Sequence, residues 1–112
     1  MTARSAYFAI AFALVTSGAW AQNAAQIQKG QQVYMEQKCS ICHSINGTGN
    51  KKGPLDGVGA KLSADDIRKW ITSAPEMAAA AKAERKPAMK AYTTLSKDDL
   101  DALVAYISSL KK

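Results

Sequence analysis

The sequence predicts a small all-α domain with about three to five helices joined by long loops. Two segments begin with a serine followed by paired aspartates and then carry apolar residues at helical spacing. Residues 24–38 show a stripe of apolar or small residues at the same period. No segment alternates apolar and polar residues between hairpin turns, as exposed strands would, and no internal repeat is found.

The first residues are expected to form a secretory signal peptide. Arg4 provides a positive start, residues 6–15 are an apolar run, and Ala19-Trp20-Ala21 fits an A-x-A cleavage site. The alternative is a membrane anchor, but the run is shorter than the roughly twenty residues that a spanning helix needs. We therefore expect removal of residues 1–21, a mature domain of residues 22–112, and a periplasmic protein without stable membrane insertion.

The mature chain is expected to begin with a helix and a long loop. Residues 24–38 place Ile27, Gly30, Val33 and Tyr34 on one helical face. A glycine costs helix stability, so its place on that face predicts a close packing partner. Residues 46–60 contain five glycines and Pro54, a composition typical of a loop, and loops of this length are often functional.

Two capping signals then introduce two further helices. After Ser63, the helical stripe comprises Ile67, Trp70, Ile71 and Ala74, and Pro75 should end or restart the helix. Residues 76–86 are rich in alanine and can add a turn or two. After Ser96, the stripe comprises Leu100, Leu103, Val104, Ile107 and Leu110.

The charge of the chain favours an acidic partner. The formal net charge is +6, of which Arg4 in the expected signal peptide contributes one. Nucleic acid is not expected as the partner, because the protein is expected to be exported and its basic residues are interleaved with acidic ones. The alternative is an ordinary solvated surface. The candidate docking residues are Lys51, Lys52, Lys82, Arg85, Lys86 and Lys90.

Both cysteines of the chain and its only histidine fall within five residues, Cys39-Ser-Ile-Cys42-His43. A redox dithiol would need a βαβ context that the sequence lacks. A zinc site takes four ligands, and the chain offers these three, of which the adjacent Cys42 and His43 are poorly placed for one metal. A disulfide would close a very small loop and give His43 no role.

A covalent haem uses all three side chains. In c-type attachment the two thiols add to the vinyl groups of the porphyrin, and the histidine that follows reaches the iron, so C-x-x-C-H is the signature of this cofactor. Export is consistent with attachment outside the cytoplasm. We expect one covalent haem c, held by Cys39 and Cys42, with His43 as the proximal ligand through Nε2.

The other axial ligand cannot be a second histidine. Met35 lies four residues before Cys39, too near the proximal face, and Met77 continues the stripe of the helix before it, where core packing is the usual role. Met89 follows Pro87 in a loop between two helical segments, from which a side chain can reach across a haem. Met89 is therefore the favoured ligand, with Met77 or an open or water-filled position as alternatives.

These residues resemble class I cytochrome c, the small monohaem bacterial kind, over nearly all of the expected mature chain. Gly53-Pro54-Leu55 is similar to the proline loop of that family, Met89-x-Ala-Tyr92 to its methionine loop, and Leu103-Val-Ala-Tyr106 to its C-terminal helix. Lys90 is a departure, since many members have proline directly after the ligand methionine.

The resemblance implies further roles for single residues. The carbonyl of Pro54 would accept a hydrogen bond from Nδ1–H of His43, which fixes the tautomer of the ligand. Gly30 and Tyr34 would pack against the C-terminal helix near Tyr106. Trp70 would approach a haem propionate, and simple core packing is an equally open alternative.

The expected function is transfer of single electrons between redox proteins by Fe(III)/Fe(II) cycling, without enzymatic activity. His/Met ligation would raise the reduction potential. The alternative is a haem c subunit that accepts electrons within a periplasmic dehydrogenase complex, such as a sulfur-compound-oxidising enzyme. A catalytic or gas-sensing haem would need an open iron site, against which Met89 argues. The protein is expected to be a monomer or a small subunit of a complex.

Overall fold

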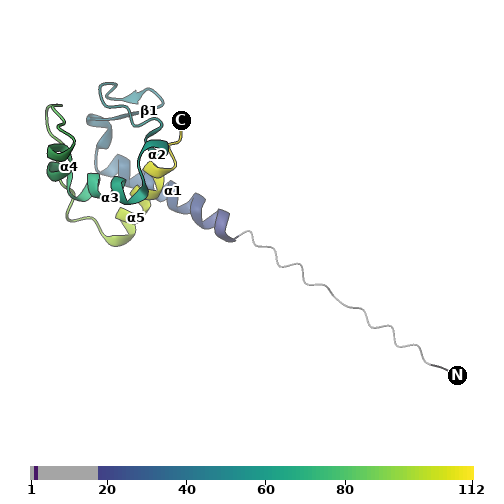
Figure 1. The fold of residues 1–112 in the computed structure, drawn as a ribbon. Coiled ribbons are helices and arrows are strands. Elements are labelled where there is room, and N and C mark those ends of the chain that lie inside the picture. The colour runs from purple at the N-terminus through teal and green to yellow at the C-terminus, as the bar shows by residue number, and fades with distance from the viewer. Residues whose placement is uncertain (1, 3–17) are drawn as a thin grey trace.

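The computed structural model describes Thr2 and residues 18–112. Most of the predicted signal peptide, residues 1–21, lies outside the described residues. The described elements are α1 (Gly18–Glu36), the 3-10 helix η1 (Cys39–Ile41), β1 (Ser44–Ile45), β2 (Thr48–Gly49), α2 (Val58–Lys61), α3 (Ala64–Thr72), α4 (Ala74–Ala80) and α5 (Lys97–Ser108) (Figure 1). The five α-helices of this part of the chain confirm the predicted small, mainly helical fold.

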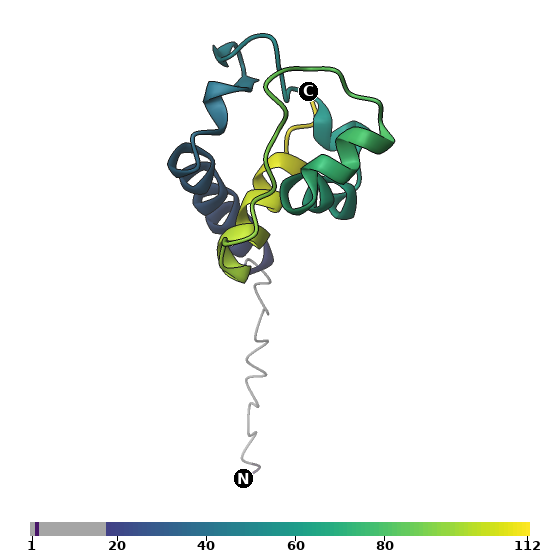
Figure 2. The same ribbon diagram turned by 90° about the vertical axis from the view of Figure 1, so that its left-hand side faces the viewer.

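Helices α1 and α5 cross in close contact at Gly30 (Figures 1 and 2). A Cβ atom at this position would overlap the carbonyl oxygen of Ala102 and the Cβ of Tyr106. One turn further along, the rings of Tyr34 and Tyr106 meet edge to face, with 5.8 Å between centroids and an interplanar angle of 78°. The predicted close partner of Gly30 is therefore the C-terminal helix.

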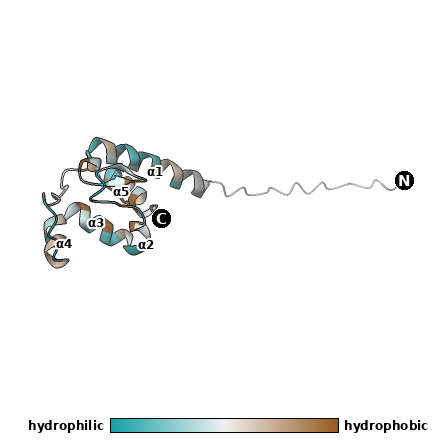
Figure 3. Cartoon of the chain, turned by 90° about the horizontal axis from the view of Figure 1, so that it is seen from above, coloured by the Kyte–Doolittle hydropathy of each residue, from teal (hydrophilic) through white to brown (hydrophobic). Residues whose placement is uncertain are grey.

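Serine caps begin α3 and α5, as the sequence predicts. The side chain of Ser63 accepts a hydrogen bond from the backbone N–H of Asp66, and Ser96 accepts one from Asp99, each at 3.1 Å. Pro75 lies in the first turn of α4, so it restarts the helix after α3 has ended. In Figure 3 the apolar positions of α3 and α5 lie towards the interior of the domain.

Two short elements interrupt the segment predicted as a continuous loop. Residues 46–60 contain β2 and the start of α2, and β2 pairs antiparallel with β1 in the register Ser44 to Gly49 and Ile45 to Thr48. The sequence pattern did not predict this hairpin, because strands of two residues are too short to show alternation. Its two turn residues, Asn46 and Gly47, have φ values of 51° and 79°, as a tight two-residue turn requires.

The core of the described domain lies between α1, α3 and α5. It contains Val33, Tyr34, Ile67, Ile71, Leu103, Val104, Tyr106 and Ile107. These side chains include residues from all three predicted helical stripes, so the periodicity identified the buried faces correctly. Within residues 18–112, none of the helices combines the length and the apolar character that crossing a membrane requires.

Candidate functional site

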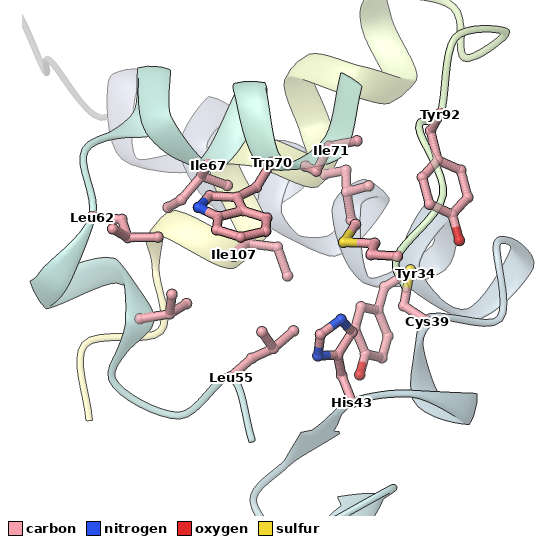
Figure 4. A pocket seen from close by; sticks show the side chains of 13 residues that line it. Tyr34, Cys39, His43, Leu55, Leu62, Ile67, Trp70, Ile71, Tyr92 and Ile107 are labelled. Carbon is pink, nitrogen blue, oxygen red and sulfur yellow. The ribbon is translucent and has the colours of Figure 1, made fainter. Parts of the chain in front are cut away.

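An apolar cavity of about 210 Å³ opens beside this core. Figure 4 shows its lining, in which His43 and Leu55 lie across the cavity from Trp70 and Ile67 of α3. The lining residues come from all parts of the domain and are Tyr34, Cys39, His43, Leu55, Val58, Leu62, Ile67, Trp70, Ile71, Met89, Tyr92, Leu103 and Ile107. The structure thus brings together four of the six predicted site residues, namely Cys39, His43, Trp70 and Met89.

The cysteine–histidine segment reaches the cavity through a tight turn after α1. Lys38 adopts a left-handed conformation, with φ of 57°, and η1 follows at once. The carbonyl of Cys39 accepts the backbone N–H groups of Cys42, at 3.1 Å, and His43, at 2.9 Å. Both cysteines are free, half-buried thiols. Cys42 is absent from the cavity wall, so of the two thiols only that of Cys39 lines the described cavity.

The ring of His43 is held by the carbonyl of Gly53 and not by that of Pro54. Nδ1–H donates to Gly53 O at 3.0 Å, which leaves Nε2 for a further partner. The prediction was one residue out because Ser44 pairs with this loop. Its backbone N–H donates to Gly53 O at 3.1 Å, and its own carbonyl accepts from Leu55 at 2.9 Å. This register directs the Gly53 carbonyl towards His43.

Burial determines the protonation of these side chains. It raises the pKa of the Cys39 thiol from 9.0 to about 11. A redox dithiol needs a lowered thiol pKa, so this environment contradicts that alternative. Burial also lowers the pKa of His43, and the nearby positive charge of Arg85 acts in the same direction against the Gly53 hydrogen bond. The imidazole is therefore favoured in the neutral form that can bind a metal.

Only one of the three candidate methionines lines the cavity. Met89 does so, Met77 does not, and Met35 is 68% exposed. The Met89 segment is fastened to α3, because the backbone N–H of Tyr92 donates to the carbonyl of Ile71 at 2.8 Å. Lys90 stands where the related family commonly has proline. Its Nζ lies over the Tyr92 ring, 4.9 Å from the centroid, as in a cation–π contact.

Sequence reasoning did not identify an unpaired hydroxyl on one of the residues that line this cavity. The hydroxyl of Tyr34 is buried and has no hydrogen-bond partner among the described residues. Burial is the main reason that the pKa of Tyr34 rises from 10.0 to about 12. Helical periodicity placed Tyr34 in the core, but a one-dimensional pattern cannot show that the hydroxyl would lack a partner.

The donor set fits a covalently attached haem. Two free thiols, a neutral imidazole with one free nitrogen and a thioether are the groups that this cofactor requires, and the apolar walls suit a porphyrin. Within residues 18–112, no three side chains of His, Cys, Asp or Glu converge as they would in a metal site built from protein ligands alone. The zinc alternative therefore has no support in the described part of the chain.

Comparison with known proteins agrees with this donor set. Residues 27–111 match the cytochrome c family. Cytochrome c oxidase subunit 2 of Alkalihalophilus pseudofirmus is 30% identical over 92 residues, which cover 74% of this chain and 25% of the relative. No solved structure gave a significant match. Because the family match extends over most of the sequence, this chain belongs to the cytochrome c family of haem electron-transfer proteins, whose cofactor is covalently bound haem c.

Proposed function

We propose that this protein is a periplasmic carrier of single electrons with one haem. In this proposal Cys39 and Cys42 attach the haem, and His43 and Met89 bind the iron. The supporting observation is that His43 and Met89, 46 positions apart in the sequence, line the same apolar cavity. A cavity with one candidate ligand would fit a gas-binding or catalytic haem better, because those functions need an open iron site.

Haem c supplies a one-electron Fe(III)/Fe(II) couple, and the chain sets the conditions for it. The Gly53 carbonyl orients His43 and makes it a stronger ligand by accepting a hydrogen bond from Nδ1–H. The apolar wall excludes water, which disfavours the extra positive charge of the oxidised state and raises the potential. Trp70 lines the same wall, and we propose its indole N–H as a donor to a haem propionate.

The electron acceptor is proposed to be a terminal oxidase. The relative that matches this chain is named as subunit 2 of cytochrome c oxidase, which supports an oxidase partner. A basic surface would suit such a partner if its docking face is acidic. Ile41, between the two cysteines, is 65% exposed and could provide an apolar contact within that surface. The expected signal peptide at the start of the sequence supports a periplasmic location.

Removal of each methionine tests the ligand assignment. Met89→Ala should remove the red charge-transfer band that methionine ligation gives the oxidised protein, admit carbon monoxide to the reduced iron, and lower the reduction potential. Met77→Ala is the matched control, because Met77 is a half-buried methionine that does not line the cavity. It should leave the band and the potential unchanged.

The reverse pattern, with the band lost in Met77→Ala and kept in Met89→Ala, would contradict the assignment. If the wild-type protein binds carbon monoxide at once and shows no charge-transfer band, its iron has an open position. That result would contradict a six-coordinate electron carrier. Free extraction of haem by acidic acetone would show that Cys39 and Cys42 do not hold it covalently.

A further inference from the structure

Arg85 connects two loops that carry different parts of the proposed haem site. It lies in the segment between α4 and α5, four positions before Met89, and Figure 2 shows this segment crossing the domain between the two helices. Its guanidinium packs against Gly53 in the loop after η1. A Cβ atom at Gly53 would overlap Nη1 of Arg85 and would lie 2.9 Å from its Cζ.

Gly53 is also the residue that holds the proximal ligand. Its carbonyl accepts Nδ1–H of His43 at 3.0 Å and the backbone N–H of Ser44 at 3.1 Å. The face of Gly53 that Arg85 covers is bordered by the carbonyl of Cys42, which a Cβ atom would also overlap. Only glycine leaves room there, so the guanidinium rests against the backbone that orients His43.

The positive charge of Arg85 has no carboxylate partner among the described ion pairs. Those pairs join Lys29 with Asp99, and both Arg68 and Lys97 with Asp101. Because the guanidinium packs against Gly53, whose carbonyl binds the His43 ring, its charge lies close to the proposed proximal ligand. A cation held there should oppose the extra positive charge of an oxidised iron bound to His43.

We propose that Arg85 is a positioning residue that fastens the Met89 loop to the His43 loop and whose charge raises the reduction potential. The inference rests on the proposed ligation by His43 and Met89. The contact with Gly53 restrains the segment four residues before Met89, so the thioether stays near the iron. Arg85 is exposed at the surface, so solvent screens its effect on the potential.

Substitutions at two adjacent positions separate this role from a general effect of surface charge. Arg85→Gln removes the charge and the planar guanidinium, and Lys86→Gln removes the same charge one residue away. Two quantities are measured on the purified holoprotein without a partner protein: the midpoint potential and the affinity of the oxidised form for imidazole, which competes with Met89. Arg85→Lys retains the charge and loses the planar contact.

Arg85→Gln should have a lower potential than Lys86→Gln and should bind imidazole about fivefold more tightly than the wild type, as a contact worth about 1 kcal/mol would give. Arg85→Lys should keep the wild-type potential but bind imidazole more tightly. The proposal requires both the lower potential of Arg85→Gln relative to Lys86→Gln and its tighter binding of imidazole relative to the wild type. Equal potentials in the two glutamine variants, or unchanged imidazole affinity in Arg85→Gln, would overturn it.

This outcome is distinct from a failure of the proposed function. If Met89 were not a ligand, the wild type itself would lack the methionine charge-transfer band and would bind imidazole without competition, whatever residue stood at position 85. If the wild type keeps the band, and Arg85→Gln and Lys86→Gln have the same midpoint potential and the same imidazole affinity, only the role of Arg85 is rejected.

Discussion

At the scale of single residues, the site depends on backbone atoms that the sequence does not specify directly. The bond from Nδ1 of His43 to Gly53 O selects the tautomer and leaves Nε2 free. The residue types Cys39, Cys42, His43 and Met89 could be predicted because their chemistry is rare and this chain has few of them. Which carbonyl of the Gly53-Pro54 pair faces His43 depends on the pairing with Ser44, and composition cannot reveal that.

Tyr34 gives a prediction about alkaline pH. Its pKa is about 12 in the folded protein and 10.0 when unperturbed, so between these values the folded protein keeps a proton that the unfolded chain has lost. The unfolded state then binds fewer protons, and stability falls as pH rises from about 10 to 12. Tyr34→Phe should lose less stability over this range, as measured by denaturant unfolding at a series of pH values.

At neutral pH the same substitution should change the free energy of unfolding by less than about 1 kcal/mol, because the hydroxyl has no partner to lose among the described residues. Identical pH dependence in the wild type and in Tyr34→Phe would show that the buried hydroxyl is not the group that titrates.

At the scale of elements, the sequence predicted the helices that have local signals and missed the features that depend on contacts between distant segments. The stripes and the serine caps predicted α3 and α5 closely, because apolar spacing and capping are local signals. The β1–β2 hairpin was missed although Asn46-Gly47 is a recognised turn signal, since each strand has only two residues and shows no alternation. The contact of Arg85 with Gly53 joins distant loops and has no local signal.

Gly30→Ala tests the helix crossing. The new methyl group would meet the backbone of Ala102, which cannot rotate away, so α1 and α5 must separate. Overpacking typically costs about 1–3 kcal/mol, and the better helix propensity of alanine returns about 1 kcal/mol. Because the overlap is with backbone, the cost should lie near the upper end of this range, and denaturant unfolding should show a net loss of about 2 kcal/mol.

Gln31→Ala is the matched control, because Gln31 is the next residue of α1 and is exposed. It should be neutral or slightly stabilising. A stable Gly30→Ala variant with an unchanged unfolding midpoint would mean that the helices do not approach so closely in solution.

At the scale of the whole molecule, the haem completes the core. The cavity is lined by residues of α1, α2, α3 and α5 as well as by the loops, so a group inside it would contact four of the five described α-helices. We predict that removal of the haem, or prevention of its attachment with Cys39→Ala and Cys42→Ala, leaves a chain with much less helix. Circular dichroism of the haem-free protein and the holoprotein measures the difference in helix content.

The matching control is holoprotein prepared in the same buffer, which should melt cooperatively. A haem-free chain with the full helical signal and a cooperative transition would show that the side chains alone suffice as a core.

The candidate docking residues Lys86 and Lys90 give a prediction about association with a redox partner. The rate of electron transfer should fall as salt is added, because surface charges are screened with a Debye length of about 10 Å at about 0.1 M salt. Lys86→Glu with Lys90→Glu should lower the rate further and weaken its dependence on salt.

The same charge change at Lys61 and Lys69, exposed residues of α2 and α3, is the control and should have a smaller effect. A rate that does not change with ionic strength would reject electrostatic steering and leave the solvated-surface alternative for these residues.

The buried thiol of Cys39 has a consequence for the order in which the protein is assembled. With a pKa of about 11, only about one thiol in ten thousand is the reactive thiolate at neutral pH once the domain has closed. An open chain exposes the same thiol to water and returns it to ordinary reactivity. Maturation is therefore fastest if cofactor attachment precedes closure of the fold, and a chain that closes early would be a slow substrate for the attachment machinery.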